Sequence, residues 1–136
     1  ARKKKKAREI DYDFEISFFE KLLKMRPHFI QALIALGNVY TQKGDYEKGL
    51  AIDLRLRELR RDDPTVHYNL ACSYSLLGRI NDAFLSLKRA IDLGYEDFDY
   101  LLRDPDLENL RKDKRFQCLL KKAASKQLFL KKHDAR

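Results

Sequence analysis

The chain has 136 residues, of which 44% are hydrophobic and 37% are charged. This composition suits one globular domain with a real core, and the chain lacks the run of about 18 apolar residues that a transmembrane helix needs. The formal net charge of +8 gathers at the ends, because residues 1–8 carry +6 and residues 121–136 carry +5, which leaves −3 between them. No secretory signal pattern opens the chain, so we expect a cytoplasmic protein with two reduced thiols, Cys72 and Cys118.

The first segment, residues 1–8, is predicted to be a basic tail. Its positive side chains are Arg2, Lys3, Lys4, Lys5, Lys6 and Arg8. Such a run can keep a chain in solution, or it can dock on phosphate or on an acidic protein. The sequence leaves both readings open.

Residues 9–26 are predicted to form a helix that carries more apolar surface than one neighbour can cover. Successive residues of a helix are separated by about 100° around its axis, so its large apolar side chains cannot all face the same way. We expect Leu22 and Met25 to face the following hairpin, and Phe14 and Phe18 to remain uncovered. An exposed apolar patch usually marks a contact site, so Phe14 and Phe18 are predicted to form a self-association patch.

The middle of the chain repeats itself with a period of about 34 residues, which is the length of a helix hairpin in stacked arrays. Tyr40 and Tyr74 are separated by one such period, and so are Gly44 and Gly78. The glycines can adopt the left-handed backbone that ends a helix. The period therefore predicts two helix hairpins, residues 29–43 with 45–61 and residues 64–77 with 80–93.

The first helices of the two hairpins share one pattern of large and small residues. They read Leu33-x-x-Leu36-Gly37-x-x-Tyr40 and His67-x-x-Leu70-Ala71-x-x-Tyr74. This pattern resembles the signature of the tetratricopeptide-repeat family. The resemblance implies an all-α fold, a right-handed superhelix of antiparallel helix hairpins. It also implies a repeat domain over residues 9–112, made of a half repeat (9–27), two repeats (about 30–63 and 64–97) and a capping segment (98–112).

The capping segment has its own helix-start signal at Asp104-Pro105, with Asp as the cap and Pro in the first turn. It resembles the segment that closes short bacterial repeat arrays. A closing basic helix is predicted within residues 113–136, with Cys118 half-buried. Its lysines are Lys121, Lys122, Lys126, Lys131 and Lys132.

The sequence offers no convergent set of catalytic or metal-binding residues. Its three histidines are scattered, and His67 occupies a core position, where a packing role is expected. Asp104, Asp106 and Glu108 are expected in the first turn of a helix, where the macrodipole favours acids. We therefore expect a protein that is not an enzyme and holds no cofactor or metal.

Function is expected instead in the concave groove that the resemblance implies. The residues predicted to line it are uncharged: Gln31, Ile34, Asn38, Thr41, Gln42, Thr65, Tyr68, Asn69, Cys72 and Ser75. Amides and hydroxyls of this kind can pair with the backbone of an extended peptide. The leading hypothesis is a protein-interaction module, an adaptor or assembly scaffold, with a peptide or protein partner and no membrane contact.

Two alternatives stay open at this point. The first is a nucleic-acid- or ribosome-associated protein that uses the basic ends. The second is a self-associating structural protein, a homodimer for example, built through the incomplete N-terminal repeat.

Overall fold

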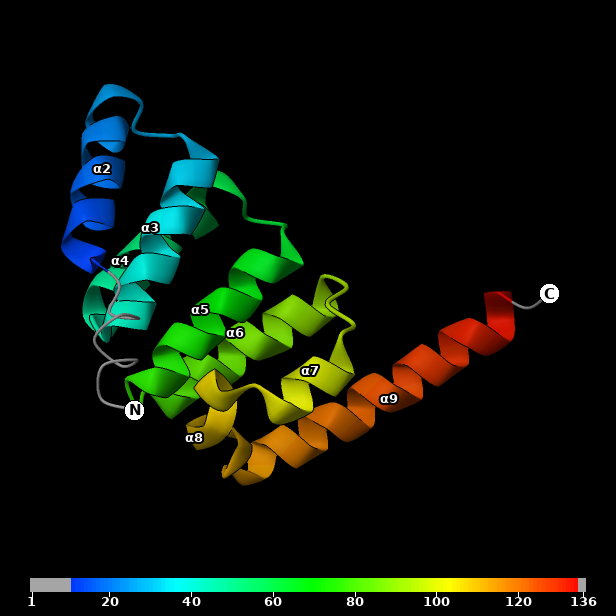
Figure 1. The fold of residues 1–136 in the computed structure, drawn as a ribbon. Helices are drawn as coiled ribbons and strands as arrows, with labels where there is room; N and C mark the ends of the chain where they lie inside the picture. The colour runs from blue at the N-terminus through cyan, green and yellow to red at the C-terminus, as the bar shows by residue number, and fades with distance from the viewer. Residues whose placement is uncertain (1–10, 135–136) are drawn as a thin grey trace, which may run out of the picture. The chain divides into compact units, whose positions relative to one another are not determined.

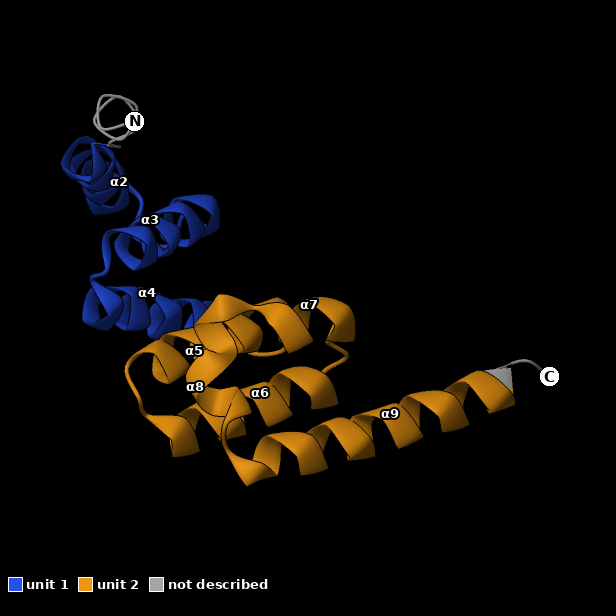
Figure 2. Ribbon diagram, turned by 60° about the horizontal axis from the view of Figure 1, so that its bottom comes forward, with its two compact units in different colours: residues 1–59 blue, residues 60–136 orange. Residues whose placement is uncertain are grey.

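The computed structural model describes residues 11–134, and every regular element in this range is helical, which confirms the all-α class (Figure 1). The elements are α2 (Tyr12–Met25), α3 (Ile30–Lys43), α4 (Tyr46–Leu59), α5 (Pro64–Leu76), α6 (Ile80–Asp92), α7 (Phe98–Arg103), the 3-10 turn η1 (Pro105–Leu107), α8 (Glu108–Arg111) and α9 (Lys114–Asp134). Two compact units divide between Leu59 and Arg60 (Figure 2). Within the described range, no helix is both long and apolar enough to cross a membrane.

The first unit contains the hairpin of α3 and α4, with α2 packed alongside α3. The buried residues of α3 include the predicted Leu33, Leu36 and Tyr40. Two glycines let α3 and α4 approach closely: a Cβ added at Gly37 would lie 3.2 Å from Ile52 Cγ2, and one added at Gly49 would lie 3.0 Å from Thr41 Oγ1. The repeat pattern thus reflects helix-to-helix packing.

Helix ends follow the signals in the sequence. Gly44 and Gly78 have φ values of 95° and 75°, a left-handed conformation that costs glycine little. Asp63 caps α5 by accepting a hydrogen bond from the Thr65 backbone N–H at 2.9 Å, and Pro64 occupies the first turn. The predicted hairpin helices therefore match the observed α3 to α6 within about two residues at each end.

The second unit packs the hairpin of α5 and α6 against the segment that follows it. We call residues 94–111 the closing segment; it contains α7, η1 and α8. Its leucines Leu101, Leu107 and Leu110 are fully buried, as is Phe116 at the start of α9. Asp104 caps η1 by accepting from the Asp106 backbone N–H at 3.0 Å, as the Asp-Pro signal predicted. The closing segment is thus part of the core of this unit.

Two single-residue expectations in this unit have different outcomes. His67 is buried, and its Nε2 lies 2.7 Å from the backbone carbonyl oxygen of Arg61, so it is the satisfied packing histidine expected. Cys118 is exposed, and the expectation of half-burial is wrong. Phe116, Leu119 and Ala123 turn inward, and position 118 lies on the opposite side of α9.

Candidate functional site

The predicted groove residues of α3 form an exposed row. We call Gln31, Ile34, Asn38, Thr41 and Gln42 the α3 row. All are exposed except Thr41, which is half-buried and donates a hydrogen bond from Oγ1 to the Gly37 carbonyl at 3.1 Å. Ile34 keeps 40% of its surface exposed. The α3 row therefore offers amide groups and one aliphatic side chain to the surroundings.

The corresponding residues of α5 have a different environment. We call Thr65, Tyr68, Asn69, Cys72 and Ser75 the α5 row. Thr65 is exposed and Asn69 is half-buried, but Tyr68, Cys72 and Ser75 are buried. The prediction that these three residues line an open groove is wrong, because the chain's own closing segment covers them.

Side chains of α5 and of the closing segment bind each other. Tyr68 donates its hydroxyl hydrogen to Asp104 Oδ2, and Cys72 Sγ lies 3.7 Å from the same oxygen. The ring of Tyr68 stacks on Tyr95, with centroids 4.3 Å apart and planes 3° from parallel. Asp104 is only 3% exposed, so this contact is made away from water.

A second contact lies further along α5, at Ser75. The Oγ atom of Ser75 accepts a hydrogen bond from the Leu110 backbone N–H at 3.2 Å. The Ser75 carbonyl accepts another from Asn109 Nδ2 at 3.0 Å. The polar side chains that look like groove donors and acceptors in the sequence thus bind the closing segment instead.

Burial controls the protonation of this cluster. It raises the pKa of Tyr68, with the Cys72 side chain and the Asp104 carboxylate adding to the effect. Burial also raises the pKa of the Cys72 thiol, helped by Asp104, and that of Asp106, again helped by Asp104. A thiol kept protonated in this way is a poor nucleophile.

Cys72, Asp104 and Asp106 place their potential ligand atoms within 4.8 Å of one another. The hydrogen bonds to Asp104 from Tyr68, Cys72 and the Asp106 backbone N–H account for this proximity. The geometry supports a structural role for the cluster, which holds the closing segment against α5.

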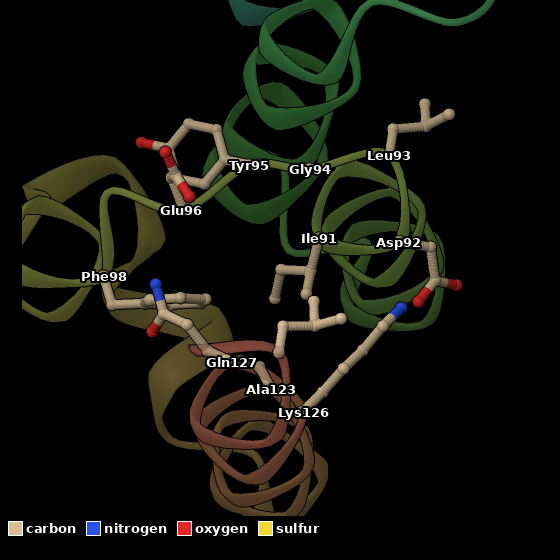
Figure 3. Close-up of a pocket in the computed structure, with 11 residues that line it drawn as sticks. Ile91, Asp92, Leu93, Gly94, Tyr95, Glu96, Phe98, Ala123, Lys126 and Gln127 are labelled. Carbon is tan, nitrogen blue, oxygen red and sulfur yellow. The ribbon is translucent and has the colours of Figure 1, made fainter. Parts of the chain in front are cut away.

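A separate cavity of about 240 Å³ lies between α9 and the end of α6 (Figure 3). Its lining is mostly apolar, with Asp92 and Glu96 from the α6 side and Lys126 from α9. Among the described residues, no acid forms an ion pair with Lys121, Lys122, Lys126, Lys131 or Lys132, and all five are exposed. The N-terminal bases Arg2, Lys3, Lys4, Lys5, Lys6 and Arg8 lie outside the described residues.

The predicted patch on α2 is exposed, with 70% of Phe14 and 55% of Phe18 open to solvent. Met25 is 80% exposed, so the expectation that it faces the hairpin is wrong; Leu23 is the buried residue at this end, and Leu22 is half-buried. The reason is geometric, because Met25 falls on the same side of the helix as Phe14 and Phe18.

Comparison with known proteins identifies the repeats. A family model described as tetratricopeptide repeat matches residues 30–52 and 64–93. A chloroplastic protein from Arabidopsis thaliana is 38% identical over 91 residues, covering 62% of this chain and 26% of that protein. The chain therefore spans about a quarter of the length of this relative.

A solved structure supports the fold. "MamA 41-end from Desulfovibrio magneticus RS-1" superimposes with a TM-score of 0.62 over 85% of this chain and 68% of that one, at 21% sequence identity. The first family match covers α3 and the first half of α4, and the second covers the hairpin of α5 and α6. This chain therefore carries two tetratricopeptide repeats, which begin at residues 30 and 64.

Proposed function

We propose that this protein is a non-catalytic protein-binding module whose partner segment lies on the α3 row. Tetratricopeptide repeats typically serve as protein-interaction modules, and this chain carries two. The observation that supports the α3 row as the binding surface comes from the other repeat of the same chain. The equivalent positions of the next repeat, on α5, already hold a peptide segment.

The repeat period relates the two rows residue by residue. Ile34 corresponds to Tyr68, Asn38 to Cys72 and Thr41 to Ser75. On α5 these positions donate to a carboxylate and accept from a backbone N–H of the closing segment. On α3 the corresponding side chains are exposed or half-buried, and Asn38 can both donate and accept. The α3 row therefore has the position and the chemistry to hold a segment contributed by another protein.

The composition of the α3 row favours a particular kind of segment. It contains no charged side chain, so a strongly charged peptide would gain little from it. Asn38, Gln31 and Gln42 can pair with backbone N–H and C=O groups, and Ile34 can cover one apolar side chain. An uncharged or weakly charged segment with one apolar anchor fits best.

The test compares the two rows in one protein. A partner captured on the full chain should bind about 5- to 150-fold more weakly to Asn38→Ala/Gln42→Ala, since each lost amide hydrogen bond costs about 0.5–1.5 kcal/mol. The matched control is Thr65→Ala, an exposed position of the α5 row, which should bind as the unchanged chain does. Full affinity after the α3 substitutions would contradict the proposal.

A second candidate function rests on the unpaired lysines of α9. Five exposed ammonium groups on one helix can attract a phosphate polymer. Phe129, the aromatic residue among them, packs against the tilted His133 ring with centroids 4.0 Å apart, so less of the Phe129 ring surface is available to stack on a base. We rank nucleic-acid binding second for this reason. A cytoplasmic location stays a prediction, as do the domain boundaries expected from the sequence.

A further inference from the structure

Helix α2 has two apolar faces, and among residues 11–59 only one of them is covered. Leu23 is buried and Tyr12, Ile16 and Phe19 are half-buried, and these four residues lie on one side of the helix. Helix α2 packs against α3 (Figure 1). Phe14, Phe18, Lys21 and Met25 are all exposed and follow one another at spacings of four, three and four residues. This spacing forms a stripe along the whole helix, directly opposite the buried side. We call these four residues the α2 stripe.

The repeat register shows what would normally cover this part of α2. Phe18 stands one repeat period before Ile52, which packs on Gly37 of the first helix of its repeat. Glu15 stands one period before Gly49, which lets α3 approach α4 closely. At the position where α4 has a glycine, α2 has the long side chain of Glu15. A first helix therefore cannot dock on α2 as α3 docks on α4, and the stripe needs a cover of different geometry.

The charges along α2 indicate the direction of that cover. The beginning of the helix is acidic and the end is mainly basic, with Asp11, Asp13 and Glu15 against Lys21, Lys24 and Arg26. A parallel copy would set Asp13 beside Asp13 and Lys24 beside Lys24. An antiparallel copy sets Asp13 near Lys24 and also opposes the two helix dipoles, so both contributions are favourable.

We propose that α2 pairs in an antiparallel manner with α2 of a second copy of this chain. In this arrangement Phe14 lies opposite Met25 of the second copy, and Phe18 lies opposite Lys21. The register is self-consistent, because reversing one helix about the midpoint between Phe18 and Lys21 maps the stripe onto itself. Lys21 can then place its ammonium group over the Phe18 ring, while Phe14 and Met25 cover each other.

The pairing is expected to be weak and to stop at a dimer. A helix of 14 residues is about 21 Å long, and a single helix pair of that length is smaller than a standard protein interface. Because each copy uses the same patch, the contact is satisfied at two copies and does not propagate into a filament. A reversible dimer is the expected state.

Sedimentation of the full chain from about 1 μM to about 1 mM tests association, a range that brackets a weak dimer. Phe18→Glu should abolish the dimer, because it would place carboxylates in the apolar contact. The matched control is Leu85→Glu, which changes an equally exposed apolar residue of α6 and should leave the dimer intact; Leu85 is 61% exposed. Circular dichroism should show the same helix content for both variants, since neither side chain is buried. A strict monomer, or a dimer that survives Phe18→Glu, would overturn the proposal.

Engineered thiols test the direction of the pair. In a Cys118→Ser background, chains with Phe14→Cys and chains with Met25→Cys are mixed and oxidised with glutathione disulfide; Cys72 is buried and stays in place. The mixed disulfide should exceed either self-disulfide by at least about tenfold, since paired thiols react at a high effective concentration. An excess of the Phe14→Cys self-disulfide would indicate a parallel pair and overturn the antiparallel arrangement.

Discussion

The hydroxyl group of Tyr68 donates a hydrogen bond to the carboxylate of Asp104, a residue 36 positions later in the chain. This bond joins the face of α5 that corresponds to the α3 row to the start of η1. Both side chains are buried, so neither has water as an alternative partner. This pair is therefore one of the contacts that hold the closing segment over the α5 row.

Removal of the Tyr68 hydroxyl should destabilise the second unit. Tyr68→Phe keeps the ring stacked on Tyr95 but deprives the buried Asp104 carboxylate of a donor. The expected loss is about 1–3 kcal/mol in the free energy of unfolding, because a buried polar group left without its partner carries its desolvation cost. Thermal or urea unfolding measures it. Tyr46→Phe, at a half-buried tyrosine of the first unit, is the control and should cost less than about 0.5 kcal/mol. Equal stability of both variants would mean that the Tyr68–Asp104 bond contributes nothing.

The two thiols should differ in reactivity. Cys118 is exposed, whereas Cys72 is buried beneath the closing segment and burial raises the pKa of its thiol. A colorimetric thiol reagent should modify one thiol per chain quickly, and Cys118→Ser should eliminate this fast phase. Asp104→Ala should accelerate the slow phase, since it removes the acceptor that fastens the cover over Cys72. A slow phase unchanged by Asp104→Ala would show that other contacts hold the segment closed.

The sequence predicts the helices well because their signals are local. The repeat period, Gly44 and Gly78 at helix ends, and the Asp104-Pro105 start are all readable without knowledge of tertiary contacts. The closure of the α5 row depends instead on a contact between Tyr68 and a residue 36 positions away. From sequence alone, Tyr68, Cys72 and Ser75 look like the lining of a groove.

Two signals in the sequence could have led to a better prediction. The α5 row contains Cys72, a residue type that proteins usually bury, and the α3 row has no cysteine. The exposure of Met25 follows directly from its spacing of seven residues from Phe18. For the remaining residues, the α3 row with Thr65 and Asn69, a groove shared by both hairpins stays a prediction.

The ion pair at the start of α9 predicts a specific pH response. Hydrogen bonds from Arg115 lower the pKa of Asp113 from 3.8 to about 2. A depressed carboxyl pKa contributes stability that is fully present above pH 3.8 and is lost as the pH falls through about 2. Carboxyl carbon NMR should show Asp113 titrating near the lower value, and Arg115→Gln should move the midpoint up toward 3.8. A midpoint that Arg115→Gln leaves unchanged would contradict the assignment to this pair.

The lysines of α9 decide between the two candidate functions. If they hold nucleic acid, the affinity for a generic RNA should fall steeply with salt, because each phosphate contact releases counterions. Lys121→Gln, Lys122→Gln and Lys126→Gln together should then reduce the slope of log affinity against log salt by about one unit per lysine. Lys43→Gln is a matched control outside α9, since Lys43 pairs with Asp13 at 3.0 Å. We expect the captured protein partner to be unaffected by the three α9 substitutions, because the α3 row contains no lysine. Loss of that partner, together with RNA binding at moderate salt, would place the function on α9 instead.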